Sequence, residues 1–207
     1  MSPKVSKQHM EQRRALILEN AKEVFMEHGY EQTTMKHIMD AANVSRGGLY
    51  QYFSNKEDVY ETLLEERLAQ STMEAELLFE EEIHSHWELL MTAIFGSEQQ
   101  PNDKMDPMAP SNLEFFITGR NNQRRREYGT VRYYAGLKIY TDIIEQGQQS
   151  GEFSLKYQCE VLARTIVSFI DGLALEHAIL PKEDLKIKEQ ATLFVEYLKM
   201  ALGVKQY

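Results

Sequence analysis

Apolar residues recur three or four positions apart along most of this chain, and this period constrains the fold more than any other feature of the sequence. An amphipathic helix buries one face with that period, whereas a half-buried strand alternates at every second residue. No long stretch alternates as a strand would. We therefore predict an all-α protein with helices over residues 17–28, 35–42, 45–53, 57–83, 84–95, 112–118, 124–146, 161–180 and 183–202.

Residues that start or stop helices stand between these stretches. Ser45 is a good N-cap for a short helix that we expect to reach about Phe53. Residues 97–110 hold three of the five prolines and are predicted to form a loop. The other predicted helix ends are Gly29, Asn43-Val44, Gly147, Gly151 and Pro181.

The sequence offers little support for catalysis, metal binding or membrane insertion. Its one cysteine, Cys159, can form neither an intrachain disulfide nor a cysteine metal cage. His84 and His86 are two positions apart, so a helix would point them to different sides. No run of about 18 apolar residues exists, and no secretory signal is recognisable at the N-terminus. We therefore predict a cytoplasmic protein without enzymatic activity, cofactor, metal site or membrane partner.

The net charge of −9 is unevenly distributed. Residues 1–56 contain eight Lys and Arg against six Asp and Glu, so the acidic excess lies in residues 57–207. Because exposed charges act over only about 8 Å at physiological salt, a basic end can bind a polyanion on an acidic protein. The basic residues Lys4, Lys7, Arg13 and Arg14 either contact DNA non-specifically or form a solvated tail.

Residues 33–56 have the plan of a helix-turn-helix, with the sequence TTMKHIMDAANVSRGGLYQYFSNK. In such a unit the second helix inserts its N-terminal end into the DNA major groove. Gly47 and Gly48 each cost a helix about 1 kcal/mol relative to alanine, and close approach of the backbone to a ligand would explain them. The Tyr50 hydroxyl can donate to phosphate, and the Gln51 amide can pair with the edge of adenine. The pattern alone leaves DNA binding and simple packing equally open.

The same region closely resembles the N-terminal domain of TetR-family transcriptional regulators. The matching motifs are Phe25–Tyr30, Thr33-Thr34, Ile38–Ala42, Asn43–Phe53 and Lys56–Val59. Asn43 stands where the family usually has glycine, and asparagine also tolerates the left-handed conformation. Gly48 replaces a residue that usually carries a side chain, so one base contact is missing.

The resemblance implies roles for individual residues. Phosphate contacts are implied for Thr33, Thr34, Tyr50, Tyr52 and Lys56, and approach to the bases for Arg46, Gly47 and Gln51. The whole predicted DNA-binding set is Thr33, Thr34, Lys36, Ser45, Arg46, Gly47, Gly48, Tyr50, Gln51, Tyr52 and Lys56.

The resemblance also implies a two-part organisation, with a three-helix DNA-binding domain over 1–56 and a helical effector-binding and dimerisation domain over 57–207. The predicted dimer contacts are Gly172, Ala174, Ala178, Ile187, Phe194 and Leu198. The residues that either line an effector pocket or simply form core are Trp87, Met91, Phe95, Phe115, Phe116, Tyr133, Tyr134, Phe169 and His177. The loop 97–110 would cover the pocket, and Glu88 and Glu114 favour a cationic or amphipathic effector.

We therefore expect a bacterial-type, ligand-responsive repressor that binds palindromic operator DNA as a homodimer and is released by an unknown small-molecule effector. One alternative is a transcriptional activator on the same scaffold. Another is an all-helical enzyme or ligand-binding protein whose helix-turn-helix is only structural. DNA binding that weakens steeply with salt would exclude this second alternative.

Overall fold

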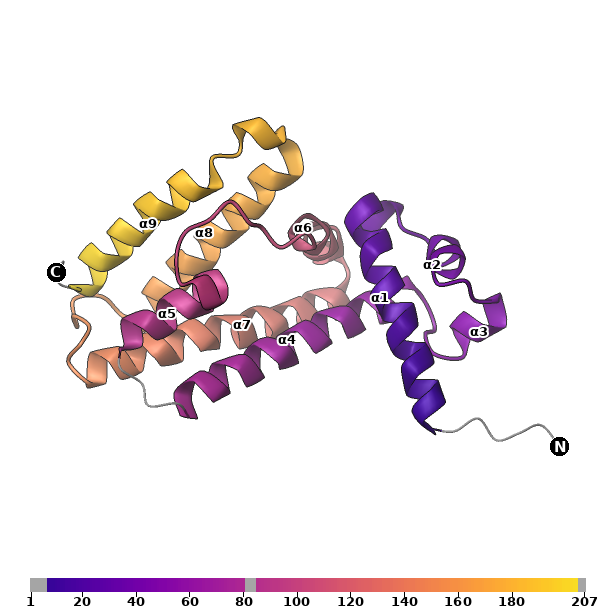
Figure 1. Ribbon diagram of the computed structural model, residues 1–207, viewed down its shortest axis with the longest axis horizontal. Helices are drawn as coiled ribbons and strands as arrows, with labels where there is room; N and C mark the ends of the chain where they lie inside the picture. The colour runs from indigo at the N-terminus through magenta and orange to yellow at the C-terminus, as the bar shows by residue number, and fades with distance from the viewer. Residues whose placement is uncertain (1–6, 81–84, 205–207) are drawn as a thin grey trace. The chain divides into compact units, whose positions relative to one another are not determined.

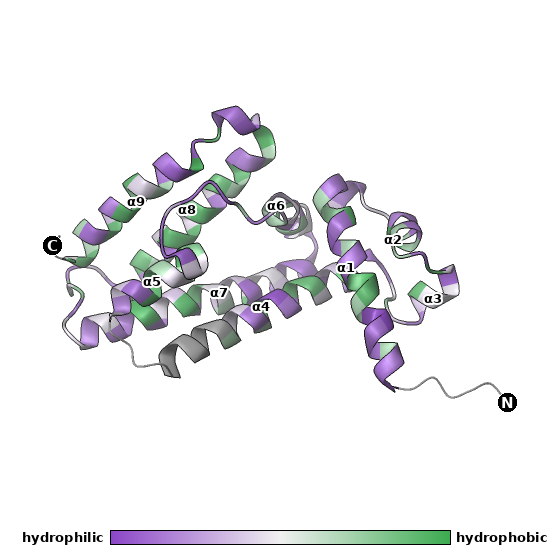
Figure 2. Cartoon of the chain, viewed as in Figure 1, coloured by the Kyte–Doolittle hydropathy of each residue, from purple (hydrophilic) through white to green (hydrophobic). Residues whose placement is uncertain are grey.

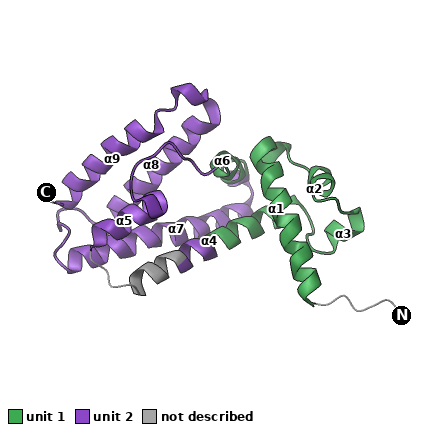
Figure 3. Cartoon of the chain, viewed as in Figure 1, with its two compact units in different colours: residues 1–67, 107–118 green, residues 68–106, 119–207 purple. Residues whose placement is uncertain are grey.

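The computed structural model describes the backbone of residues 7–80 and 85–204 and the side chains of residues 7–73 and 85–204. The described residues are mostly helical and contain no strand, which confirms the all-α prediction (Figure 1). The chain divides into two compact units (Figure 3). Unit 1 consists of Met1–Arg67 and Pro107–Thr118, and unit 2 consists of Leu68–Asp106 and Gly119–Tyr207.

Unit 1 is built from the N-terminal helices and one helix from much later in the chain. Its elements are α1 (Lys7–Gln32), α2 (Met35–Ala41), α3 (Arg46–Tyr50), the first part of α4 (Lys56–Glu80) and α6 (Ala109–Thr118). Unit 2 holds the rest of α4 with α5 (His86–Phe95), α7 (Gln123–Gln149), α8 (Cys159–Ile179), α9 (Ile187–Leu202) and the short 3-10 turns Gly96–Glu98, Gly119–Asn121 and Lys182–Asp184.

The centre of unit 1 is a cluster of aromatic rings through which α6 packs against α1 and α4. The ring of Phe115 on α6 lies 4.9 Å, centroid to centroid, from both Tyr30 and Tyr60. The Ser111 hydroxyl donates to the carbonyl oxygen of Phe25 inside α1 at 2.7 Å. Phe115 is fully buried, as expected if it is a core residue, and its role in an effector pocket stays a prediction.

Unit 2 has a main core formed by α5, α7, α8 and α9. Leu90, Ile144, Ile166 and Leu202 are fully buried in it, one from each helix. Burial of side chains of this size contributes about 1.5–3 kcal/mol each, so this core provides most of the stability of the unit. A smaller apolar cluster of Leu173, Leu185 and Ile187 joins the C-terminal part of α8 to the start of α9. Met105, from the loop before α6, packs against this cluster.

Most predicted helix boundaries lie within about four residues of those observed, but some are wrong. The helix predicted over 17–28 is α1, which starts at Lys7 and continues to Gln32 after a bend at Gly29. Gly147 does not end a helix: it lies inside α7, where an added Cβ would come within 2.3 Å of the Phe153 ring. The glycine is there because the chain folds back over this turn, and Gly151, with φ of 81°, makes the reversal. The loop predicted over 97–110 ends earlier, because Pro110 belongs to the first turn of α6, where a missing N–H costs nothing. The predicted helix end at Ile83 and the site of His84 lie outside the described residues.

The N-terminus of α5 is closed by a carboxylate from elsewhere in unit 2. Glu152 accepts hydrogen bonds from the Ser85 hydroxyl at 2.6 Å and from the backbone N–H groups of His86 and Trp87 at 2.7 and 2.9 Å. A His86 ring nitrogen also lies 2.7 Å from it. Partial burial by itself would raise the pKa of Glu152, but these hydrogen bonds outweigh it and hold the pKa below its usual value.

Among the described helices, none is long and apolar enough to cross a membrane.

Candidate nucleic-acid interface

The turn between α2 and α3 is held by local side-chain caps. Thr34 caps α2, and its hydroxyl accepts the N–H of His37 at 3.2 Å. Asn43 adopts φ of 49° in the turn, as expected for a residue in a position that favours glycine. Ser45 caps α3, and its hydroxyl accepts the N–H of Gly48 at 3.2 Å. Two helices joined by such a tight, capped turn form a helix-turn-helix.

The outer side of α3 is open and carries groups suited to DNA. Arg46, Gly47, Tyr50 and Gln51 are exposed, and the Arg46 guanidinium lies 5.5 Å from the centre of the Tyr50 ring. Nothing lies within 4 Å of the place where a Cβ of Gly47 would be, so a phosphate or a base edge can approach the backbone there. The arrangement therefore presents a cation, a phenol, an amide and bare backbone on one short helix.

Two residues predicted to contact phosphate have internal roles. Thr33 is 1% exposed, and its hydroxyl donates to the carbonyl oxygen of Gly29 at 2.7 Å. The Lys56 ammonium donates to the carbonyl oxygens of Tyr30 at 2.6 Å and Glu31 at 3.1 Å. These side chains satisfy the carbonyl groups left open where Gly29, with φ of 72°, bends the end of α1. A phosphate contact by Thr33 would require its buried hydroxyl to leave this hydrogen bond, and a contact by the half-buried Lys56 stays a prediction.

The remaining predicted DNA contacts differ in accessibility. Lys36 and Thr34 are exposed on α2, whereas Tyr52 and Gly48 are half-buried. Ser45 is exposed, but its hydroxyl is engaged as the helix cap. Their contact with DNA stays a prediction.

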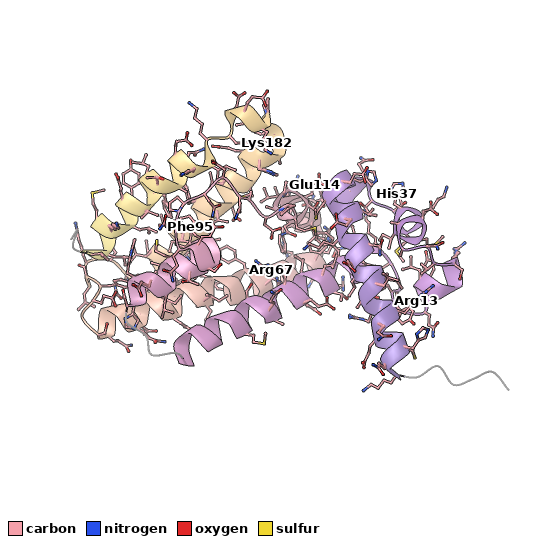
Figure 4. The ribbon with its side chains drawn as sticks, viewed as in Figure 1. Arg13, His37, Arg67, Phe95, Glu114 and Lys182 are labelled. Atoms are coloured by element: carbon pink, nitrogen blue, oxygen red, sulfur yellow. The ribbon has the colours of Figure 1, made fainter. Side chains whose placement is uncertain are left out.

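Sequence reasoning missed an exposed pair of histidines beside these residues. The ring centroids of His28 on α1 and His37 on α2 lie 5.1 Å apart, and both side chains are exposed. Figure 4 shows His37 on α2 of unit 1. In the sequence, the sign of this pair was His37, which follows the predicted DNA contact Lys36. The pairing with His28 depends on how α1 and α2 pack, and the spacing of residues along the chain does not reveal this packing.

The residues predicted to line an effector pocket do not form one set. Met91 is buried in the main core of unit 2, and Trp87, Phe95 and Phe169 pack against it. Phe116 lies on α6 of unit 1, its ring 5.3 Å from Phe115. Tyr133 and Tyr134 on α7 are 37% and 53% exposed, so they are not core residues, and their role in an effector pocket stays a prediction.

The guanidinium carbon of Arg164 on α8 lies 5.7 and 5.6 Å from the ring centres of Tyr133 and Tyr134. His177 is half-buried near the end of α8, and its Nδ1 is enclosed without a hydrogen-bond partner among the described residues. A separate hollow of about 140 Å³ lies between α8 and α9, lined by Phe169, Gln190, Leu193, Phe194 and Tyr197.

Several predicted dimer contacts are core residues of the single chain. Ile187, Phe194, Leu198 and Ala174 are 2–7% exposed, because the apolar seam of α9 packs against α8 and α7 of the same chain. The stacked rings of Phe169 and Phe194, 4.0 Å apart, show this packing. These four residues are therefore packed within the single chain, and their contact with a partner stays a prediction. Gly172 and Ala178 are exposed on α8, and their role in a dimer stays a prediction.

The capped α2–turn–α3 unit and its exposed cation, phenol and amide define a helix-turn-helix DNA-binding protein. Comparison with known proteins narrows this class. Residues 17–63 match the family model described as "Bacterial regulatory proteins, tetR family", and residues 94–188 match "Tetracyclin repressor-like, C-terminal domain".

One relative, the uncharacterized HTH-type transcriptional regulator YfiR of Bacillus subtilis (strain 168), is 30% identical over 202 residues, 98% of each chain. The protein therefore belongs to the TetR family of transcriptional regulators, which are DNA-binding proteins and not enzymes.

Two further similarities are to another relative and to a solved structure. The Fatty acid metabolism regulator protein of Bacillus subtilis (strain 168) is 28% identical over 165 residues, 75% of this chain and 78% of that protein. A crystal structure of the regulator FadR from Bacillus subtilis in complex with stearoyl-CoA has the same fold, with a TM-score of 0.67 and 23% identity. That similarity covers 93% of this chain and 99% of FadR.

Proposed function

We propose that this chain is a ligand-responsive repressor that binds palindromic operator DNA as a homodimer and is released by a small molecule held in its C-terminal domain. We assign DNA binding to residues 1–56 and effector binding and dimerisation to residues 57–207. The α3 face of Arg46, Gly47, Tyr50 and Gln51 supports the DNA-binding part, since it offers both phosphate and base-edge partners.

The observation that supports the proposed response to an effector is the set of hydrogen bonds that join α6 to the N-terminal helices. Besides the Ser111 hydrogen bond to Phe25, the Tyr60 hydroxyl donates to the Asn112 side-chain oxygen at 2.8 Å. The N–H of Glu31 donates to the Glu114 carboxylate at 3.1 Å. The chain enters and leaves α6 from unit 2, and α4 itself continues from one unit into the other. A rearrangement of unit 2 would therefore displace α6, whose residues are hydrogen-bonded to α1. This displacement is a route by which effector binding could change DNA binding.

The effector we favour is a long-chain acyl thioester, the class of ligand in the FadR complex. The interior of unit 2 is strongly apolar, and on α7 the half-buried Arg125, Tyr128 and Arg132 precede the buried Leu137 and Ile144. This order suits a molecule with an anionic head and an apolar tail. It replaces the cationic preference drawn from Glu88 and Glu114, because Glu88 is exposed and Glu114 is bonded to α1.

A DNA-binding experiment tests the phosphate contact of Tyr50 and the base contact of Gln51. Tyr50→Phe removes one hydroxyl and is expected to weaken operator binding by about 0.5–1.5 kcal/mol, the usual net value of one hydrogen bond. Gln51→Ala is expected to relax the preference at one base pair in each half-site by about 1–3 kcal/mol. DNA selected from a random library reports both effects, and identical selected sequences for Gln51→Ala and the parent would contradict the base-reading role.

The effector is tested by titrating palmitoyl-CoA, palmitate and free coenzyme A into the protein–DNA complex. We expect release by palmitoyl-CoA alone, with a change in the emission of Trp87, the single tryptophan, which packs against the core of unit 2. Release without any change in Trp87 emission would place the effector elsewhere. Transcription from the bound promoter that rises when the gene is deleted supports a repressor, and a fall would identify an activator.

A further inference from the structure

The paired histidines His28 and His37 are exposed where α1 and α2 pack together in unit 1. Their rings are 5.1 Å apart and inclined by 45°. His28 lies in the last part of α1, and His37 in the first turn of α2, where its N–H is capped by Thr34 at 3.2 Å. Lys36 is the neighbouring exposed cation. Two imidazoles thus meet at one exposed corner.

The charged groups around this corner leave the rings accessible. From α1 the carboxylate of Glu27 lies 3.9 Å from Nε2 of His28, and Glu31 is bonded to Thr118 at 2.8 Å. From α2 the neighbours are Lys36 and Asp40, and from α6 the Glu114 carboxylate is held by the N–H of Glu31. Two of the carboxylates are therefore engaged within unit 1, and the nearest one to the pair makes only a loose contact with one ring.

We propose that His28 and His37 are DNA-backbone contacts that make the affinity for DNA depend on pH. Imidazole gains its charge between about pH 8 and pH 5. Two imidazolium groups this close repel each other in the free protein, and a phosphate placed against both would offset that repulsion. DNA binding then takes up protons, so affinity rises as pH falls. The proposal rests on the proposed DNA-binding function and adds a residue set and a condition to it.

The test uses the full chain and a fluorescent duplex of mixed sequence, because contacts to phosphate do not depend on sequence. Affinity is measured by anisotropy at fixed salt between about pH 8 and pH 6, a range in which imidazoles titrate and carboxylates stay ionised. We expect the parent protein to bind about three- to tenfold more tightly at the lower pH, as for one added charge-assisted contact.

Two substitutions at one position separate charge from shape. His37→Gln keeps a polar side chain that never ionises, and we expect most of the rise in affinity at low pH to be lost. His37→Lys carries a fixed charge, and we expect tight binding at both ends of the pH range. His9→Gln is the matched control: His9 is exposed on the same helix, about 28 Å from His28 along its axis, and this variant should keep the parent's pH dependence.

Each outcome decides the proposal. A parent protein that binds with salt-dependent affinity but no rise at low pH would overturn it while leaving the proposed function intact. The proposal is also overturned, with the proposed function intact, if His37→Gln keeps the full pH dependence of DNA affinity, or if His9→Gln loses that pH dependence. A parent protein that fails to bind DNA at any pH or salt concentration overturns the proposed function, and this proposal with it.

Discussion

The ammonium of Lys56 closes the end of α1 by donating to the carbonyl oxygens of Tyr30 and Glu31, and it lies 4.3 Å from the centre of the Tyr30 ring. Lys56→Gln leaves these carbonyl groups without their charged donor. We expect the free energy of unfolding to fall by about 1–3 kcal/mol, measured by urea denaturation. The slope of log affinity for DNA against log salt should stay as in the parent, and a slope lower by about one would identify Lys56 as a phosphate contact.

A second residue-scale prediction concerns the close contact between Gly147 and Phe153. Alanine would normally stabilise a helix interior by about 1 kcal/mol relative to glycine. Here the added Cβ would meet a ring that is itself 3% exposed and cannot move aside. Gly147→Ala is therefore expected to cost about 1–3 kcal/mol in thermal or denaturant unfolding. Gly136→Ala, where nothing lies near the added atom, is the control and should be neutral or stabilising.

At this scale the sequence predicts what depends on neighbouring residues. The Ser45 cap, the left-handed Asn43 and the exposed Tyr50 follow from local rules of turns and helices. Thr33 does not, because its hydroxyl is directed inward by a bend in α1. Whether a polar side chain faces water or a backbone carbonyl depends on packing, which a single sequence does not encode locally.

At the scale of elements, Glu152 acts as a remote cap for α5. Its pKa is lowered in the folded state, so its contribution to stability is present above the ordinary carboxyl pKa and is lost as the pH falls through that range. At pH values below about 5, we expect the free energy of unfolding to decrease. Glu152→Gln should make this decrease smaller, and at neutral pH it should lower the free energy of unfolding by about 1–3 kcal/mol. Glu145→Gln, an exposed carboxyl on α7, is the control. An unchanged acid-unfolding profile for Glu152→Gln would exclude the cap.

The placement of elements was predictable to different degrees. Helices are set by apolar period and by caps, so their number and type follow from sequence, apart from ends such as Gly147. The packing of α6 against α1 was not foreseen, because the contact between Ser111 and Phe25 joins residues 86 positions apart. Periodicity shows that a helix has an apolar face and leaves open which face will cover it.

At the scale of the whole molecule, the chain leaves an apolar face uncovered on α8 and α9, where Figure 2 shows hydrophobic segments along both helices. Leu175 and Ile179 on α8 are 50% and 67% exposed, and Leu193, Tyr197 and Met200 on α9 are 48–69% exposed. Soluble monomers rarely expose large apolar patches. The proposed twofold dimer would cover these side chains, so the interface that we propose uses the exposed side of α9 that adjoins the buried seam of Phe194 and Leu198.

Leu175→Glu tests this dimer without disturbing the core, because the side chain is exposed in the single chain. In a dimer the new carboxylate would be buried without a partner, which is costly. We expect a folded monomer, with unchanged helical content by circular dichroism and affinity for a palindromic site lower by at least about tenfold, since the two recognition helices no longer bind together. Val131→Glu, on the exposed side of α7, is the matched control and should stay dimeric. A Leu175→Glu protein that sediments as a dimer would show that copies of this chain associate through another face.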